Sequence, residues 1–455
     1  MSASPGPHRF DAKTLAGLGG PSWLARRRLL AFDAFASAPL PTSAEEDWRY
    51  GRIDELDLAE YAPFEFVPGT AHQRPLGKVR DLSSELAAPT GATTSAATRF
   101  LDRLGDLSGL LVAIDGRVVS FGLSEQAESA GVRLCPLAGE AVPPLSLGAR
   151  LSEQQETFGL LAEAFLSDGA LVEVPRGVVL SAPIVLVHLL SENSAGRAVF
   201  PRNLIQIGES AAASVVEFLA GGDERQLVVP VSEITLGDDA QMDHLSAQQL
   251  GRRAVHLGYQ ASEVARSARL RTFTATFGGG YARQFSRTAL TGEGADSRLF
   301  SVYLGAGNQL EEFRTFQEHV AARTRSELVF KGAVADQARS VYTGLIRMHK
   351  GAKRADASQT NRNLVLSDEA HAYSVPNLDI QENDVRCSHA SAVGPVDPEQ
   401  RFYLESRGVP AEVAERLILL GFFEDLIARS PHPGFANHLR ALVTERLIPP
   451  GARDE

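Results

Sequence analysis

Cysteine is scarce in this chain, since Cys135 and Cys387 are the only two among 455 residues. So few cysteines argue against a disulfide framework and agree with a reducing compartment. The amino-terminal sequence MSASPGPHRFDAKTLAG lacks the basic-then-apolar layout of a secretory signal. No run approaches the roughly 20 apolar residues that span a bilayer. These absences predict a cytoplasmic protein that does not associate with membranes.

Positive charge is also in short supply, because the formal net charge is −11 at pH 7. Affinity for polyanions comes mostly from phosphate neutralisation, so we expect no nucleic-acid partner. The densest basic run, Arg26 to Arg28, lies in a segment with helical spacing and is interpreted as a solvated helix face or a protein contact. With 44% apolar and 22% charged residues, the composition is that of a soluble globular protein.

The usual enzyme signatures are missing as well. The sequence contains no GxxxxGK[ST], HExxH, GxSxG or paired CxxC motif. The glycines at 278–280 and 305–307 lack the strand–turn–helix context of a dinucleotide site and are interpreted as turns. Any catalysis would therefore depend on parts that other proteins supply.

An internal period occupies the middle of the chain. An alanine followed five residues later by Phe or Leu recurs at spacings of 27, 28 and 27 residues, and a last copy reaches Ala322 with Leu328. Three of the four regular copies follow Gly-acid turns at Gly208, Gly237 and Gly292. The pairs with the regular spacing are Ala213/Phe218, Ala240/Leu245, Ala268/Phe273 and Ala295/Phe300.

A fixed period of this length indicates a solenoid, and its strand-like content indicates a β-solenoid. Each unit is too small to bury its apolar row alone, so successive units must stack. We therefore predict a mainly β fold: a right-handed parallel β-helix over 169–395, the hand being that of nearly all parallel crossovers. The flanking parts are predicted as a helical or mixed region at 1–168 and a helical region at 396–455. The alternative is a long antiparallel sandwich.

Several helix ends can be predicted from capping residues. Ser22 is expected to cap a helix through WLARRRLLAFDAF, and Ser152 with Gln155 forms a capping box. Asp397 and Pro398 are expected to start a helix that ends at Gly408.

A wide apolar stripe follows in the next segment, VPAEVAERLILLGFFEDLIARS. Two interpretations of this stripe stay open: a cap over the end of the solenoid, or a surface for a partner. Its members include Val413, Leu417, Leu420 and Leu426.

The stretch NDVRCSHAS, Asn383 to Ser391, places Cys387 two residues before His389. Residues two apart in a strand project from the same face, so these side chains should point together, in one row with Asn383 and Val385. A thiolate and an imidazole are competent ligands for zinc or iron, but two ligands do not close a site. The alternative is that Cys387 faces the core and His389 bonds a backbone group.

Polar residues precede this pair between Met348 and Ile380. Three of the few lysines, Lys331, Lys350 and Lys353, lie in or near this segment. Its amides and hydroxyls are expected to form a hydrogen-bonded ladder between stacked turns. The residues of the predicted ladder are Gln359, Thr360, Asn361 and Asn363.

The sequence HKGAKRADASQTNRNLVLSDEAHAYSVPNLDIQENDVRCSHASAVG, followed by FYLESRGV, resembles the carboxy-terminal core of the SufB/SufD family of iron–sulfur cluster scaffolds. The resemblance extends over roughly 165–430. SufB-like chains carry a cysteine where this chain has Arg362 and Asn363, and the SufD pattern Cys-Ser-His-Gly is matched except at Ala390. The WRY triplet at Trp48 is also similar to SufD.

The resemblance implies a non-catalytic scaffold that forms a complex with a SufB-like subunit through the β-helix and with the ATPase SufC through helices at about 397–447. A transient iron–sulfur cluster would form at the interface with SufB. His389 would be a ligand of this cluster, and Cys387 its neighbour with a less certain role. ATP hydrolysis in SufC would move the scaffold and open the interface. Whether the whole complex also carries a reduced flavin is left open.

Two alternatives are retained. The first is a β-helix enzyme acting on carbohydrate, which needs carboxylates along a groove; Asp238, Asp239 and Glu293 are the candidates. The second is a SufB-like homodimeric scaffold, and a homodimer of the isolated chain is open too.

Overall fold

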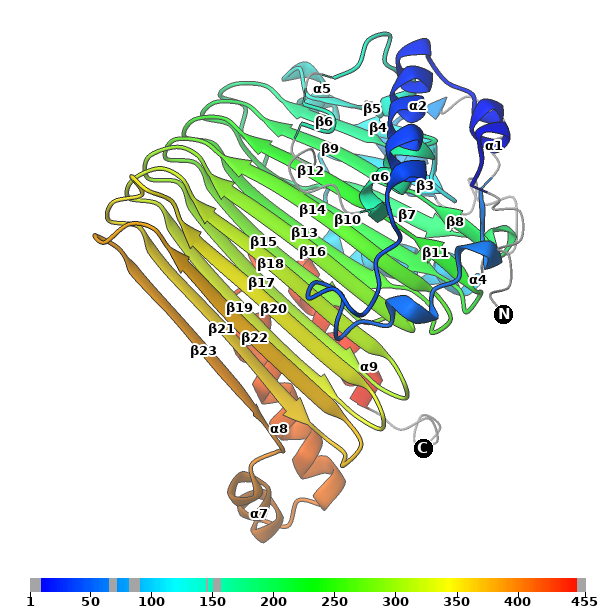
Figure 1. The fold of residues 1–455 in the computed structure, drawn as a ribbon. Helices are drawn as coiled ribbons and strands as arrows, with labels where there is room; N and C mark the ends of the chain where they lie inside the picture. Colours follow the sequence, from blue (N-terminus) through cyan, green and yellow to red (C-terminus); the bar gives the residue numbers. More distant parts are fainter. Residues whose placement is uncertain (1–9, 65–71, 82–90, 145, 150–156, 448–455) are drawn as a thin grey trace.

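The computed structural model describes residues 10–64, 72–81, 91–144, 146–149 and 157–447. Strands dominate and stack into a long parallel β-solenoid, with helices packed outside it (Figure 1). The strands in the first part of the chain are β1 Ala62–Pro63, β2 His72–Gln73, β3 Gly109–Ile114, β4 Arg117–Leu123, β5 Arg133–Pro136, β6 Ala170–Val174, β7 Ile184–Leu190, β8 Arg197–Val199, β9 Arg202–Ile207, β10 Ala212–Gly221, β11 Gln226–Val228 and β12 Val231–Leu236. The remaining strands are β13 Gln241–Gln249, β14 Val255–Val264, β15 Arg269–Thr276, β16 Tyr281–Leu290, β17 Asp296–Gly305, β18 Leu310–His319, β19 Arg325–Val334, β20 Arg339–Met348, β21 Asp356–Val365, β22 His371–Ile380 and β23 Arg386–Gly394.

From β12 onward, successive strands alternate between two sheets. Sheet A runs β22-β20-β18-β16-β14-β12-β9-β6-β5, and sheet B runs β2-β4-β3-β7-β10-β13-β15-β17-β19-β21-β23. Among the described strands, antiparallel pairing is confined to β3 with β4 and β5 with β6. The predicted mainly β, parallel solenoid is therefore confirmed, and the alternative of an antiparallel sandwich is wrong.

The alanine period marks the corner that precedes each strand of sheet B. Ala240, Ala268 and Ala295 are fully buried there, and the carbonyl of each accepts a hydrogen bond from the first residue of the next strand of the sheet. At the two ends of the period the corner residues are Ala211 and Thr324, and not Ala213 and Ala322. Small buried residues are needed at this corner, but the turn lengths differ too much for one fixed spacing.

The glycines of the Gly-acid turns allow stacked turns to approach each other closely. A Cβ on Gly237 would lie 2.8 Å from the Glu209 nitrogen, and one on Gly292 would lie 2.0 Å from the Arg266 nitrogen. Neither glycine needs a left-handed backbone, since the left-handed residues are Asp239 and Gly294, two positions later. The glycines thus serve contact between neighbouring turns.

The interior of the solenoid holds a buried polar cluster between the two sheets. The Nε2 atom of His244 lies 3.1 Å from the Glu217 carboxylate, and the Nε2 atom of His188 lies 3.0 Å from the Asn203 side-chain oxygen. Burial alone would raise the pKa of the Glu217 carboxyl, but the His244 and His188 imidazoles and the Ser232 hydroxyl together outweigh burial, and the pKa is lowered. A cavity of about 40 Å³ adjoins these side chains, which is room for water.

The α-helices of the described ranges lie outside the two sheets. None of them is both long enough and apolar enough to cross a membrane. They are α1 Ala12–Gly17, α2 Ser22–Ser37, α3 Leu76–Arg80, α4 Gly91–Leu104, α5 Glu125–Ser129, α6 Thr157–Ala164, α7 Pro398–Ser406, α8 Ala411–Ile427 and α9 Pro433–Leu447.

The amino-terminal helices differ from the prediction in two details. Helix α2 begins at Ser22 itself, with Pro21 at the capping position and no side-chain cap. Arg28 is not solvated: it is 1% exposed, and its guanidinium donates to the carbonyls of Gly19 and Leu166 at 2.6 Å each. The predicted capping box at Ser152 lies outside the described residues.

The carboxy-terminal helices do not cap the solenoid. Helices α8 and α9 lie along the outer face of sheet B, where α8 packs against β17 and β19 (Figure 1). Asp397 caps α7 by accepting from the Glu399 nitrogen, and Gly408 ends that segment with a left-handed backbone, as predicted.

The apolar stripe predicted for α8 faces the sheet only in part, and Leu420 packs half-buried against the core. Of the four residues named, Leu426 is buried, but Leu417 is 47% exposed. The buried face is formed by Ala414, Leu419, Phe423, Leu426 and Ile427.

Acid stability depends on histidines that are buried uncharged. Burial lowers the pKa of His256 on β14 from 6.5 to about 4. The unfolded chain therefore binds this proton first, so folding stability is complete above pH 6.5 and falls as the pH drops toward 4. Between pH 8 and pH 5 we expect His256→Gln to remove about 2 kcal/mol of this acid-dependent loss of folding stability. Urea unfolding of the wild type and the variant at pH 8 and pH 5 measures the free energy of unfolding. The difference between the two proteins at pH 8 gives the cost of the substitution to packing. If wild type and variant lose the same unfolding free energy between pH 8 and pH 5, His256 is not the source of the acid-dependent loss.

Candidate functional site

The solenoid ends in an open turn formed by β22 and β23. Strand β22 is the last strand of sheet A and β23 is the last strand of sheet B, and no described segment pairs with their outer edges. The two strands also contact each other across the interior. The end of the molecule that carries the candidate residues is thus a pair of unpaired sheet edges (Figure 1).

Cys387 and His389 share the inward face of β23, as predicted. In the parallel register with β21, Cys387 lies beside Ala357 and His389 lies beside Gln359. These two neighbours are buried at 2% and 1% exposure, whereas Ser358 between them is half-buried. The side chains of Cys387 and His389 therefore follow the interior row to its open end.

His389 is exposed in spite of facing inward, because no further strand covers β23. It forms no hydrogen bond or ion pair with any residue that the structure describes. The alternative in which His389 bonds a backbone group is not what this structure shows. The side chain of His389 is therefore exposed to solvent, where a partner or a ligand could reach it.

Cys387 is half-buried and packs at the edge of an apolar cluster that includes Ile346, Met348 and Ala357. Burial, together with the nearby Asp356 carboxylate, raises the pKa of the Cys387 thiol to about 11. A neutral thiol is a poor metal ligand, so Cys387 of the isolated chain is not poised to bind metal. The burial and the raised pKa thus support the alternative in which Cys387 faces the core and serves packing.

The rest of the predicted row is different. Asn383 and Val385 precede β23 and lie in a turn, where the Glu382 carboxylate accepts from the backbone nitrogen of Asn383 at 2.9 Å. Ala390, which replaces the family glycine, sits in regular strand register with Thr360. A strand needs no glycine freedom at this position, so the substitution leaves the backbone around His389 intact.

The predicted amide ladder is present in part. The Asn363 side chain donates to the Asn361 oxygen at 2.7 Å, and the Tyr303 hydroxyl donates to the Asn363 oxygen at 2.6 Å. Gln359, by contrast, is buried with neither side-chain amide atom bonded to a described residue. Its amide occupies the space left by the missing side chain of Gly344.

Sequence reasoning missed the position of Gln359 beside His389. The two residues are one solenoid turn apart, so the sequence would have placed them side by side if the length of this turn had been known. A buried amide without a partner is costly, so this position suits a bound water or ligand.

The described residues hold no group of three or more His, Cys, Asp or Glu side chains arranged to bind a metal ion. The Cys387/His389 pair therefore has no further ligand of these types from the described parts of this chain. Metal binding by this pair stays a prediction.

The carboxylates considered for a carbohydrate enzyme lie in exposed turns and are ion-paired. Asp238 and Asp239 contact Arg266 at 3.1 Å and 3.0 Å. Glu293 contacts Arg323 at 2.6 Å. Such pairs neutralise the groups that would have to act as acid and base, so no observation favours this alternative.

Lys331 has a structural role that the sequence did not reveal. Its ammonium donates to the Phe422 carbonyl at 2.9 Å and to the Asp425 carboxylate at 2.5 Å, which ties α8 to β19. Lys350 and Lys353 are exposed in the turn between β20 and β21.

The fold and the site together define a β-helix protein whose open terminal turn presents a Cys-x-His pair. The family model for the SUF system FeS cluster assembly SufBD core domain matches residues 189–422, just over half of the chain. The chain therefore belongs to the SufBD core family, and within it is most like SufD.

Curated relatives support this placement. The chain is 25% identical over 438 residues to the iron–sulfur cluster assembly protein SufD of Bacillus subtilis, covering 94% of each chain. It is 27% identical over 418 residues to SufD of Escherichia coli, covering 91% of this chain and 90% of the relative. A SufBD family protein of Mycobacterium tuberculosis is 31% identical over 297 residues, covering 63% and 73%.

The raised pKa of Cys387 predicts slow alkylation. At pH 8 we expect iodoacetamide to modify Cys387 of the isolated chain at least tenfold more slowly than a free cysteine, with the rate still rising above pH 9. Mass spectrometry of the peptide that contains Cys387 measures the rate. The urea-unfolded chain is the control and should react at the free-cysteine rate. Fast labelling of the folded chain would show a thiolate and contradict this account.

Proposed function

We propose that this chain is a non-catalytic, SufD-type scaffold subunit that pairs with a SufB-like subunit and a SufC-type ATPase to build iron–sulfur clusters. The observation that carries the proposal is the exposed imidazole of His389 on the inward row of an unpaired terminal strand. Membership of a cluster-assembly family supports the substrate class. The cluster is a transient cargo shared with the SufB-like subunit, and a reduced flavin, where present, belongs to the whole complex.

The open edges of β22 and β23 fit a partner that adds strands to both sheets. Strand addition satisfies the free backbone groups, and it continues each row of side chains into the partner. Partner residues would then stand next to His389 at the interface. Because an imidazole is a known iron ligand in iron–sulfur proteins, His389 can hold the nascent cluster while the partner supplies thiolates or carboxylates.

Cys387 has the secondary role in this proposal. Its thiol is neutral and half-buried in the isolated chain, so it becomes a ligand only if partner binding or iron lowers its pKa. His389 needs no such activation, since a neutral imidazole coordinates metals directly.

Each of the three predicted regions has its own role in this proposal. Residues 169–395 form the β-helix that carries the cluster site, and residues 396–455 dock the ATPase. Residues 1–168 form the amino-terminal region, although its strands β3 and β4 also extend sheet B. We place the complex in the cytoplasm, without nucleic acid or membrane.

The docking surface for the ATPase is assigned to α7 and the adjoining part of α8. Phe402 and Tyr403 on α7 are 71% and 58% exposed, and Leu417 on α8 is 47% exposed. Large exposed apolar groups on neighbouring helices are typical of protein contacts. Lys331 and Asp425 connect α8 to β19, so a movement of these helices would reach the sheet that ends in β23.

The ligand role of His389 predicts loss of clusters in a complex that stays assembled. We expect His389→Ala to reduce cluster yield at least tenfold on the purified three-protein complex, because a direct ligand of the cluster is lost. The absorbance of the reconstituted cluster and bound iron measure the yield. Ser388→Ala, on the opposite face of β23, is the matched control and should keep the wild-type yield. Undiminished yield in His389→Ala would remove this residue from the mechanism.

The docking role of α7 predicts a separate defect. We expect Phe402→Ala with Tyr403→Ala to weaken binding of the SufC-type ATPase at least tenfold, because buried aromatic anchors dominate such contacts. Binding of the SufB-like subunit should be unchanged. Calorimetry with each partner measures both affinities. Leu30→Ala, at 67% exposure on α2, is the control. Unaltered ATPase binding in the double variant would place the docking surface elsewhere.

A further inference from the structure

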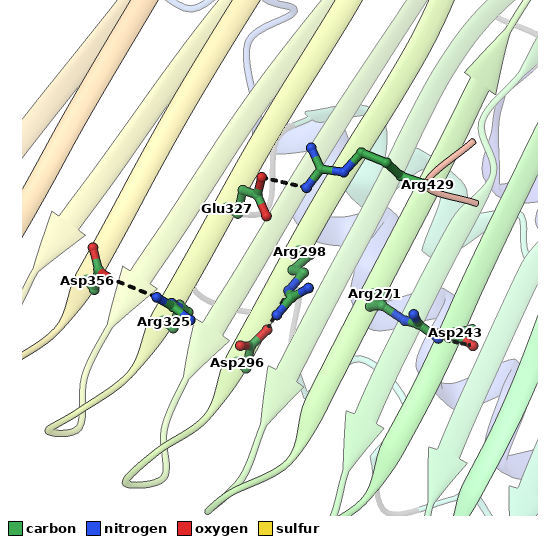
Figure 2. Close-up of polar contacts among 8 residues, drawn as sticks. All are labelled: Asp243, Arg271, Asp296, Arg298, Arg325, Glu327, Asp356 and Arg429. Atoms are coloured by element: carbon green, nitrogen blue, oxygen red, sulfur yellow. Dashed lines mark hydrogen bonds and ion pairs between the residues drawn. The ribbon is translucent and has the colours of Figure 1, made fainter. Parts of the chain in front are cut away.

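A ladder of alternating charges runs along the outer face of sheet B, near the start of its later strands, and Figure 2 shows three of its residues, Asp296, Arg325 and Asp356. The parallel register places one residue of each strand in the same row. From Arg269, on the second strand of this row, onward, basic and acidic residues alternate. The row consists of Gln241, Arg269, Asp296, Arg325, Asp356 and Arg386.

The acidic rungs of the ladder already have basic partners. Asp356 on β21 contacts Arg325 on β19 at 3.4 Å, and Asp296 contacts Arg298 at 3.3 Å within β17. The adjoining row shows the same cross-strand pairing, since Asp243 contacts Arg271 at 2.6 Å (Figure 2). Opposite charges on neighbouring strands stabilise a sheet and favour its register.

Arg386 is the last rung, on the terminal strand β23. Its side chain is exposed, and no described residue forms an ion pair with it. The acidic neighbour in its row, Asp356, is paired with Arg325 on the other side. The alternation therefore stops on an arginine at an unpaired sheet edge.

We propose that β23 is continued by a strand of a different subunit that presents an Asp or Glu side chain to Arg386. This inference rests on the proposed function and adds the chemistry of the partner strand. The occupant is the SufB-like subunit, and its carboxylate forms the next rung of the ladder.

A second copy of this chain does not meet the requirement. Strand β23, with the sequence RCSHASAVG, contains no carboxylate, so pairing of β23 with itself leaves Arg386 without an acidic neighbour. The carboxylate on the outer face of the other terminal strand, Asp379 on β22, already accepts from Arg347 at 2.7 Å. Charge complementarity thus favours a partner with a different sequence.

The ion pair would also set the register of the added strand. Arg386 and His389 are three residues apart on β23, which is roughly 10 Å along the strand. A slip of the partner strand by two residues would separate the carboxylate from Arg386 and shift every inward side chain away from His389. Pairing at Arg386 therefore places the partner's ligands opposite His389. Interface charges act in this way on specificity and register more than on affinity.

The test compares three variants of this chain in binding to the purified SufB-like subunit. Arg386→Glu should weaken binding at least tenfold, and Arg386→Gln should weaken it less, because the first adds repulsion to the loss of the ion pair. Arg269→Glu is the matched control. Arg269 is exposed in the same row and has no described ionic partner, but it lies four strands, roughly 19 Å, from the edge. The variant Arg269→Glu should bind the SufB-like subunit with wild-type affinity.

A charge swap completes the experiment. Replacing the partner's interface carboxylates one at a time by Arg should yield one variant that restores binding to Arg386→Glu. If wild type binds but Arg386→Glu binds equally well, the inference is wrong and the proposed function stands. If wild type does not bind the SufB-like subunit, both fail. A wild-type homodimer that Arg386→Glu dissociates in sedimentation would also overturn the inference.

Discussion

The backbone hydrogen bonds between stacked turns are the interaction on which the rest of this structure depends. Each strand of a parallel solenoid bonds to the strand of the turn before it and the strand of the turn after it. The corner bonds repeat the same pattern, for example from the Arg325 nitrogen to the Ala295 carbonyl at 2.8 Å. Such a stack has no natural end, because its last turn always carries free donors and acceptors.

This chain leaves that last turn open. The carboxy-terminal helices could have covered it, but α8 and α9 lie against the outer face of sheet B instead. The consequences meet on one strand. Within the part of the chain that the structure describes, β23 has a backbone edge without a paired strand, an exposed imidazole on its inward face and a cationic side chain without an ionic partner on its outward face. A second subunit that pairs with the edge of β23 would contact all three of these groups.

The sequence predicted the fold well because its signals are local. The β-rich repeats and small buried corners, such as Ala240 and Ala268, are visible in a single chain. The alternation that puts Cys387 and His389 on one face depends only on strand geometry. Their role in metal binding stays a prediction.

The misses all involve long-range geometry. The buried face of α8 depends on which sheet the helix packs against, and its apolar residues surround most of its circumference. The contacts of Gln359 and Arg386 depend on the register between turns of unequal length. Arg28 is basic and follows two arginines, so its pattern suggested solvent, whereas backbone carbonyls at its site hold it in the interior.

Hydrogen exchange on β22 and β23 tests the central claim most directly. With the SufB-like subunit bound, the account predicts that amides along these two strands slow by at least tenfold, while those of the inner strands β14 and β16 stay as they were. A stable complex in which both terminal strands exchange as fast as in the free chain would contradict the account.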